Sequence, residues 1–246
     1  MIKSIRYIVL LITVSFWGCD NENAFDCVKT VGDFSTYEIA LPSFTEIEII
    51  GDISLQIENS IEQSVSLTTG QNLYPKIDLK VVDGKLTVAD NNDCSWVRKY
   101  GNTTLHIKSN NITSIKNSGS RNVNSIGTYN IANNLYLISK NASGDYYLDV
   151  TGRELRISSN KVSNFYINGS IEKLFVGFYS GQGRFEGTDL IANNVNIFHR
   201  GSNDMMVNPQ LLLTGSIEAF GNLIVTNVPD SVNIIQNGPG QVIYGN

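Results

Sequence analysis

The sequence predicts an all-β protein: a right-handed parallel β-solenoid, which is a β-helix-like stack of short coils, preceded by a less regular N-terminal β region. Asn, Ser and Gly are abundant and form helices poorly, whereas the plentiful Ile, Val and Tyr suit a pleated surface. Apolar and polar residues alternate along many short segments, as in half-buried strands. Beyond residue 115 the pattern recurs about every 20 residues, within the range of solenoid repeats.

The first 33 residues are predicted to form an export signal and a tether. Lys3 and Arg6 precede an apolar stretch, residues 7–17, which is too short to span ~30 Å of hydrocarbon and is typical of a signal peptide. The alternative is a short buried helix. Ser15-Phe16-Trp17-Gly18-Cys19 is similar to a bacterial lipobox. We therefore expect residues 1–18 to be removed and Cys19 to carry acyl chains, palmitate among them, that anchor the protein to a membrane.

The tether, residues 19–33, begins with the acidic run Asp20-Asn21-Glu22-Asn23. Such a run is similar to the surface-export signal of some Gram-negative lipoproteins, and it is equally typical of a solvated spacer. Beyond it, the chain holds two more cysteines, Cys27 and Cys94. In an oxidising envelope compartment we expect them to form a disulfide, and the alternative is two buried free thiols.

Residues 34–114 are predicted to form the N-terminal β region. Period-two segments flank a turn at Gly51-Asp52, and a second pair flanks Asp83-Gly84, a strong hairpin signal because both positions tolerate positive φ. Residues 71–76 suggest one helical turn that Pro75 limits. This region is less periodic than the rest, so it is interpreted either as a cap on the solenoid or as a separate small β domain.

Residues 115–246 are predicted to form the repetitive solenoid. One row of apolar segments begins at residues spaced by about one repeat, and a second row follows it at a similar interval. Small or turn residues such as Ser143-Gly144 and Gly201-Ser202 separate the rows. An antiparallel β-sandwich or meander would also give even spacing and is the alternative architecture. The first row is Leu135, Leu155, Leu174, Val195, Ile217 and Val232, and the second is Tyr147, Tyr166, Phe185, Met206, Ile224 and Ile243.

A series of motifs runs in order along residues 34–246: Gly51-Asp52-Ile53-Ser54-Leu55, Asn72-Leu73-Tyr74, Val82-Asp83-Gly84-Lys85-Leu86-Thr87-Val88, the Gly-punctuated repeats, and a closing Gly238-Pro239-Gly240-Gln241-Val242-Ile243-Tyr244-Gly245. In this order they resemble the GIN-domain family of adhesin-head lipoproteins. The resemblance implies a β-helix-like head on the envelope of a Gram-negative bacterium, without enzymatic activity. The expected location is the outer membrane, facing the periplasm or the cell surface.

No catalytic or metal-binding motif stands out, and no cofactor is expected. The chain has only two histidines, His106 and His199, and His199 is expected at an exposed corner. Carboxylates such as Asp145 and Asp204 fall at different places in successive repeats, and no calcium-loop motif occurs. The net charge of −5 and the lack of a basic cluster argue against a nucleic-acid partner.

Outward aromatic residues are the best candidates for a binding surface, because alternation sends them to the solvent side of predicted strands. We expect a non-enzymatic adhesin-like module for glycan or protein ligands. The alternatives are a carbohydrate-active enzyme on a solenoid scaffold and a structural envelope protein that assembles with itself through an uncapped terminal coil. The candidate residues are Tyr136, Phe175, Tyr179 and Phe198, together with Tyr147 and Tyr166, which would stack about 4.8 Å apart if their coils adjoin.

Overall fold

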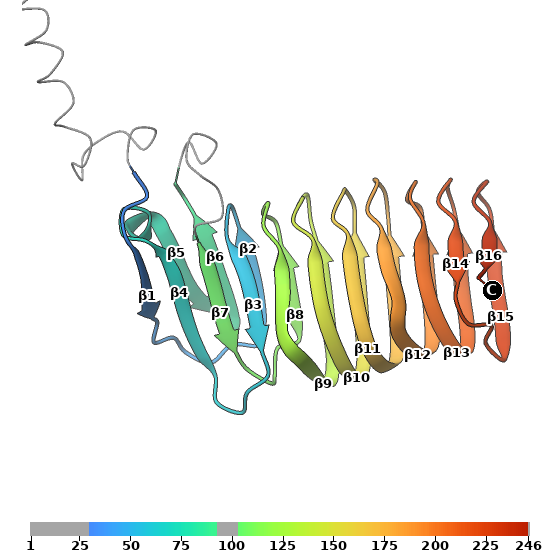
Figure 1. Ribbon diagram of the computed structural model, residues 1–246, viewed down its shortest axis with the longest axis horizontal. Coiled ribbons are helices and arrows are strands. Elements are labelled where there is room, and N and C mark those ends of the chain that lie inside the picture. Colours follow the sequence, from blue (N-terminus) through green and yellow to red (C-terminus); the bar gives the residue numbers. More distant parts are fainter. Residues whose placement is uncertain (1–29, 93–102, 246) are drawn as a thin grey trace, which may run out of the picture.

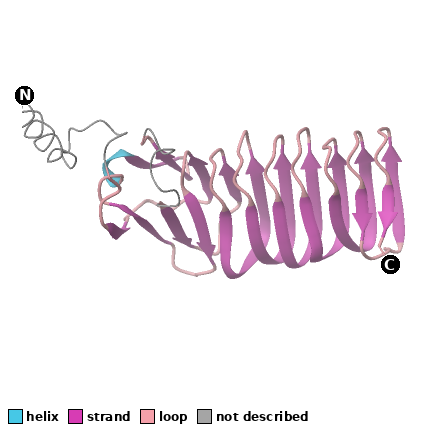
Figure 2. Ribbon diagram, turned by 45° about the horizontal axis from the view of Figure 1, so that its top comes forward, coloured by secondary structure: helices cyan, strands magenta, loops and turns pink. Residues whose placement is uncertain are grey.

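The computed structural model describes residues 30–92 and 103–245, and these residues are almost entirely β structure (Figure 1). The strands are β1 (Phe34–Glu38), β2 (Glu46–Ile50), β3 (Ser54–Glu58), β4 (Ser64–Gly70), β5 (Ile77–Val82), β6 (Lys85–Asp90), β7 (Thr104–Lys108), β8 (Ser114–Asn117), β9 (Val123–Ser139), β10 (Tyr146–Ser159), β11 (Phe165–Phe178), β12 (Phe185–His199), β13 (Met205–Ile217), β14 (Leu223–Val225), β15 (Ser231–Gln236) and β16 (Val242–Tyr244). A short 3-10 helix, η2 (Tyr74–Lys76), confirms the predicted helical turn beside Pro75 (Figure 2).

The predicted parallel β-solenoid is confirmed, with about seven turns. Strands β9 to β13 each pair in parallel with the next, and each bends in the middle so that its two halves belong to opposite rows (Figure 1). Row A contains β3, β7, the first halves of β9–β13, β14 and β16. Row B contains β2, β6, β8, the second halves of β9–β13 and β15. The parallel pairing excludes the antiparallel sandwich for the repeats.

The core runs between the two rows as columns of inward side chains in register. In row A, Tyr146 and Phe165 stack with ring centroids 4.4 Å apart. In row B, Leu155 pairs with Leu135 and Leu174, and all three are buried. Each fully buried side chain of this size contributes roughly 2 kcal/mol through removal from water. Because every coil covers the core residues of its neighbours, stacking itself creates the core.

The register of the columns corrects two members of the predicted rows. Leu213, not Ile217, pairs with Val195 and continues the row B column to Val232. In row A, Glu186 pairs with Tyr166, and Phe185 points inward as a fully buried core residue. Register shifts between β12 and β13 explain the first error, because the bend there differs in length from its neighbours.

In the loops that lead from row B to row A, hydrogen bonds between side chains and backbone N–H groups form a ladder from coil to coil. The backbone N–H of Asn164 donates to the Asp145 carboxylate at 2.7 Å, and the N–H of Asp145 donates to the Asn122 side-chain oxygen at 3.0 Å. The same bond recurs from Arg184 to Asn164, from Asn222 to Asp204 and from Gln241 to Asn222. Asp145 and Asp204 therefore occupy one structural position, contrary to the expectation that these carboxylates fall at different places in successive repeats.

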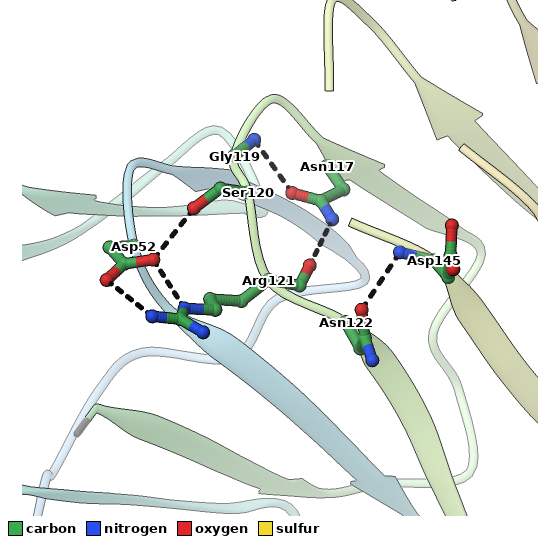
Figure 3. Close-up of polar contacts among 7 residues, drawn as sticks. All are labelled: Asp52, Asn117, Gly119, Ser120, Arg121, Asn122 and Asp145. Carbon is green, nitrogen blue, oxygen red and sulfur yellow. Dashed lines mark hydrogen bonds and ion pairs between the residues drawn. The ribbon is translucent and has the colours of Figure 1, made fainter. Parts of the chain in front are cut away.

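In the first coils this loop edge carries a polar cluster, shown in Figure 3. Asp52, between β2 and β3, accepts hydrogen bonds from the Ser120 hydroxyl at 2.7 Å and from Arg121 Nη2 at 3.0 Å. Burial opposes ionisation of Asp52, but the hydrogen bonds from Arg121 and Ser120 outweigh it and hold its pKa below the ordinary value. The Asn117 side chain bonds the carbonyl of Arg121 and the N–H of Gly119. The cluster thus fixes the junction of β8 and β9 against the preceding coil.

Residues 34–114 combine solenoid coils with antiparallel strands. The Asp83-Gly84 hairpin is confirmed: both residues have positive φ, and β5 pairs antiparallel with β6. The turn at Gly51-Asp52 joins row B to row A, since β2 pairs with β6 and β8 while β3 pairs with β7 and β9. Strands β1 and β4 add an antiparallel pair beyond β7.

The predicted signal peptide and Cys19, Cys27 and Cys94 lie outside the described residues, so lipidation and the disulfide stay predictions. Within the described part of the chain, no helix is long and apolar enough to cross a membrane.

Candidate ligand-binding faces

The solenoid exposes two broad surfaces, one on each row of strands. We call the outward surface of row A face A and that of row B face B. Each face consists of outward side chains in register, one from every coil, so that each column runs along the axis of the stack. The six predicted binding residues are divided between the two faces, and they do not form a single cluster.

Face A carries Tyr147 and Tyr166. Their rings stack with centroids 4.8 Å apart and an interplanar angle of 6°, which confirms the predicted ladder geometry. Tyr147 is 41% exposed. Burial and the neighbouring Asp145 carboxylate raise the pKa of its hydroxyl, which therefore stays protonated at neutral pH. The pair is a compact aromatic platform on face A.

Face B carries Tyr136, Phe175, Tyr179 and Phe198. The ring centroids of Tyr179 and Phe198 lie 5.2 Å apart, and Tyr179 is exposed. The rings of Phe175 and Tyr179 cover Gly177, because a Cβ added there would meet both rings at 3.0 Å. Part of this aromatic surface therefore packs against the sheet where a glycine leaves a gap.

A shallow groove of about 410 Å³ crosses face B over strands β10 to β13. We call it groove B. Two columns in register form its walls: Glu154, Lys173, Asn194 and Leu212, and beside them Arg156, Phe175, Asn196 and Thr214. Phe175 is the predicted binding residue that lines it.

The polar contacts of groove B leave several groups available to a ligand. Arg156 lies over the Phe175 ring, 4.8 Å from its centroid, and donates to the Glu154 carboxylate at 3.0 Å. Asn196 donates its amide N–H to the Thr214 hydroxyl at 2.8 Å. Lys173 makes no ion pair within residues 30–92 and 103–245. Sequence reasoning missed these residues, although their spacing of about one repeat would have aligned them had the coil register been known.

Face B near the N-terminus is also charged, and there two lysines share one carboxylate. Glu48 accepts hydrogen bonds from Lys116 and Lys85, which lower the pKa of its carboxyl. On face A, Glu58 lies between Lys108 and His106, with Lys108 contributing most to the lowered pKa of Glu58. These pairs tie adjacent strands together.

The structure corrects the expected position of His199. This residue is fully buried in row B. Its ring lies edge-on to that of Phe178, with the ring centroids 6.2 Å apart. Burial lowers the pKa of the imidazole, which is neutral at neutral pH. Over the described residues, no three His, Cys, Asp or Glu side chains are grouped so that they could hold a metal ion.

The stack of coils with side-chain columns on two faces defines a β-solenoid display scaffold. Residues 43–229 match the model of the family described as "Putative auto-transporter adhesin, head GIN domain". The match spans most of the chain, and the chain belongs to this family. Comparison with curated protein sequences finds no match.

Several solved structures have a similar fold. A "putative adhesin" from Bacteroides fragilis has a TM-score of 0.77 at 17% identity, with 87% of this chain and 97% of that chain covered. A "Putative lipid binding protein" from Parabacteroides distasonis has a TM-score of 0.63 at 17% identity, covering 87% of this chain and 98% of the other. A further "putative adhesin" from Parabacteroides merdae has a TM-score of 0.58 at 20% identity, covering 88% and 98%. At these identities the likeness establishes the fold alone.

Proposed function

We propose that the protein is an adhesin-like binding module, anchored to the outer membrane through lipid on Cys19, that binds an acidic glycan in groove B. The observation that carries the proposal is groove B itself, in which charged, amide, hydroxyl and aromatic side chains line one concave surface. Membership of a family of adhesin heads supports a binding role.

The chemistry of groove B suits a sugar chain that carries carboxylates. Asn194, Asn196 and Thr214 supply donors and acceptors for hydroxyl groups. Lys173 supplies a cation for a carboxylate, and Phe175 supplies apolar surface for a sugar ring. Because four coils contribute and strands lie about 4.8 Å apart, the groove accommodates a short oligosaccharide lying along the stack.

Catalysis is a weaker interpretation of the same groove. Glycosidases of the common kind require two carboxyl groups on either side of the scissile bond. Of the residues that line groove B in the described chain, only Glu154 carries a carboxyl group, and Arg156 already binds it.

A glycan array with the soluble form that starts at Asp20 tests the binding site. This form keeps every residue of the hydrophobic core, which begins at Phe44. We expect acidic glycans to bind, and Lys173→Glu to weaken binding at least about tenfold, which corresponds to ~1.4 kcal/mol. Lys161→Glu is the matched control, since it reverses an exposed charge outside the groove. Unchanged binding by Lys173→Glu would exclude groove B, and loss of binding in a Tyr147→Ala/Tyr166→Ala variant alone would place the site on face A.

Metabolic labelling with palmitate in the native bacterium tests the anchor. The wild-type chain is expected to incorporate label and to fractionate with the outer membrane, and Cys19→Ser is expected to do neither. Labelling that persists in Cys19→Ser would contradict the lipobox assignment.

A further inference from the structure

We infer that the C-terminal coil, formed by β15 and β16, is an interface through which two copies of this chain join end to end around a two-fold axis. This inference does not depend on the ligand in groove B. It rests on the exposure, the composition and the edges of this coil.

Within residues 30–92 and 103–245, no further coil covers the core column at the C-terminal coil. Val232 pairs with Leu213 and Tyr244 pairs with Val225, so both side chains occupy inward positions. Leu213 and Val225 are fully buried, whereas Val232 is 39% and Tyr244 is 46% exposed. Ile234 and Val242, the other inward apolar residues of this coil, are only partly buried. The coil therefore presents core side chains that another coil would cover.

The strand edges of the coil are also open. Among the described residues, β15 pairs only with β13 and β16 pairs only with β14, so the outer edge of each strand has no partner strand (Figure 1). Exposed edges with free backbone groups are templates for pairing with another chain, and soluble proteins usually protect them with charged residues. Residues 231–246 contain no charged side chain.

The opposite end of the stack is protected, which determines the partner. There, β1 and β5 are the edge strands, and they carry Glu38, Asp78 and Lys80. Strand β5 runs antiparallel to row B, whereas the strands of a following coil would have to run parallel to both rows. A head-to-tail filament is therefore disfavoured, and the uncharged C-terminal coil fits best onto the same coil of a second copy. A two-fold axis makes such an interface closed and brings edge strands together in antiparallel pairs.

The apolar surface beside the coil extends this interface. Ile235 on face B and Ile243 on face A are 58% and 42% exposed. Phe220, in the loop before β14, is 75% exposed. Exposed apolar residues therefore occur on both faces and in a loop at this end of the stack, beside the exposed core positions.

Sedimentation velocity of the form starting at Asp20, over a range of micromolar concentrations, tests the inference. We expect a monomer–dimer equilibrium in the wild type. The Ile235→Lys/Tyr244→Lys variant is expected to remain monomeric, because like charges would meet across the two-fold axis. The Ile61→Lys/Val82→Lys variant adds the same charge to exposed residues of the N-terminal region and is expected to dimerise as the wild type does.

Several results would overturn the inference. A wild type that stays monomeric at every concentration would do so, and so would assemblies that keep growing beyond a dimer. Dimerisation of the Ile235→Lys/Tyr244→Lys variant at wild-type strength would show that another surface forms the contact. Circular dichroism of each variant checks that the β structure is intact. Glycan binding by a monomeric variant would leave the proposed ligand site standing, so the two hypotheses fail separately.

Discussion

The two ends of the solenoid differ in how the hydrophobic core is covered. At the N-terminal end, antiparallel strands and a ring stack cover the core: Tyr37 and Tyr74 lie 3.9 Å apart, and Tyr74, Leu79 and Val81 pack against the first coils. At the C-terminal end, the last coil repeats the parallel pattern and leaves its inward residues partly exposed. A stacked fold supplies the core of each coil from its neighbours, so a terminal coil needs either a cap of different architecture or another coil.

The largest effect is expected inside the stack, at Gly169→Ala. Gly169 has a φ of +113°, and an added Cβ would overlap the Val150 carbonyl oxygen of the preceding coil. We expect the free energy of unfolding to fall by on the order of 4 kcal/mol. Gly127→Ala is the control, since Gly127 also has positive φ but no atom within 4 Å of the added Cβ, and it should lose only about 1 kcal/mol. Equal losses in urea denaturation would show that the coils are not as closely stacked as described.

The comparison between covered and uncovered core positions predicts unequal effects in one column. Leu213→Ala removes a fully buried side chain and is expected to lose about 3 kcal/mol. Val232→Ala, one coil further along, is expected to lose about 1 kcal/mol in dilute protein, because Val232 is already partly exposed. Urea denaturation measures both, and a Val232→Ala loss as large as that of Leu213→Ala would mean that the last coil is covered.

Acidification is expected to destabilise the stack through His199. Burial lowers the pKa of His199 in the folded protein below 6.5, its value in an unfolded chain, so the unfolded state binds the proton more readily. The contribution of neutral, buried His199 to the free energy of unfolding is fully present above pH 6.5. It is lost as the pH falls toward the pKa of His199 in the folded protein. Melting temperatures of wild type and His199→Gln between pH 7.5 and 5 should converge or cross as the pH falls. Parallel curves would show that His199 does not contribute to the pH dependence.

The smallest effect is expected in the loop ladder, at Arg184→Asn. The Arg184 side chain has no acceptor oxygen, so it cannot accept a hydrogen bond from the N–H of the next coil. It therefore interrupts the series between Asn164 and Asp204. An Asn there would offer its side-chain oxygen to the N–H of Asp204 and should stabilise the fold by up to about 1 kcal/mol, less the lost ion pair with Glu186. Asn164→Ala, which removes a bond in the same ladder, should destabilise by about 1 kcal/mol. A neutral Asn164→Ala would show that water replaces the ladder bond without loss.

Much of the fold could be predicted because its physical causes are local. Period-two alternation gives the strands, the recurrence of Leu135, Leu155, Leu174 and Val195 gives the stack, and Asp83-Gly84 gives its hairpin. The predictions failed where the bends change length: Ile217 took the place of Leu213 in one predicted column. A shift of one residue exchanges inward and outward faces, and Phe185 was placed in the column of Tyr166, where Glu186 lies.

The candidate site was harder to predict for the same reason. Aromatic residues stand out individually, so Tyr147, Tyr166 and Phe175 could be singled out without register. Lys173, Asn194 and Thr214 are unremarkable residues whose meaning comes from lying side by side across coils. The alternation that places Phe198 outward also places His199 inward with Val195 and Ile197, and its burial was missed because it was expected at a corner.

Hydrogen exchange along the whole chain, at a low and a high protein concentration, tests the contrast between the two ends most directly. We expect amides of β10 to β12 to exchange slowly at both concentrations, and those of β15 and β16 to exchange fastest in dilute protein and more slowly when it is concentrated. Equal protection of β11 and β15 in dilute protein, or exchange in β15 that is independent of concentration, would contradict this expectation.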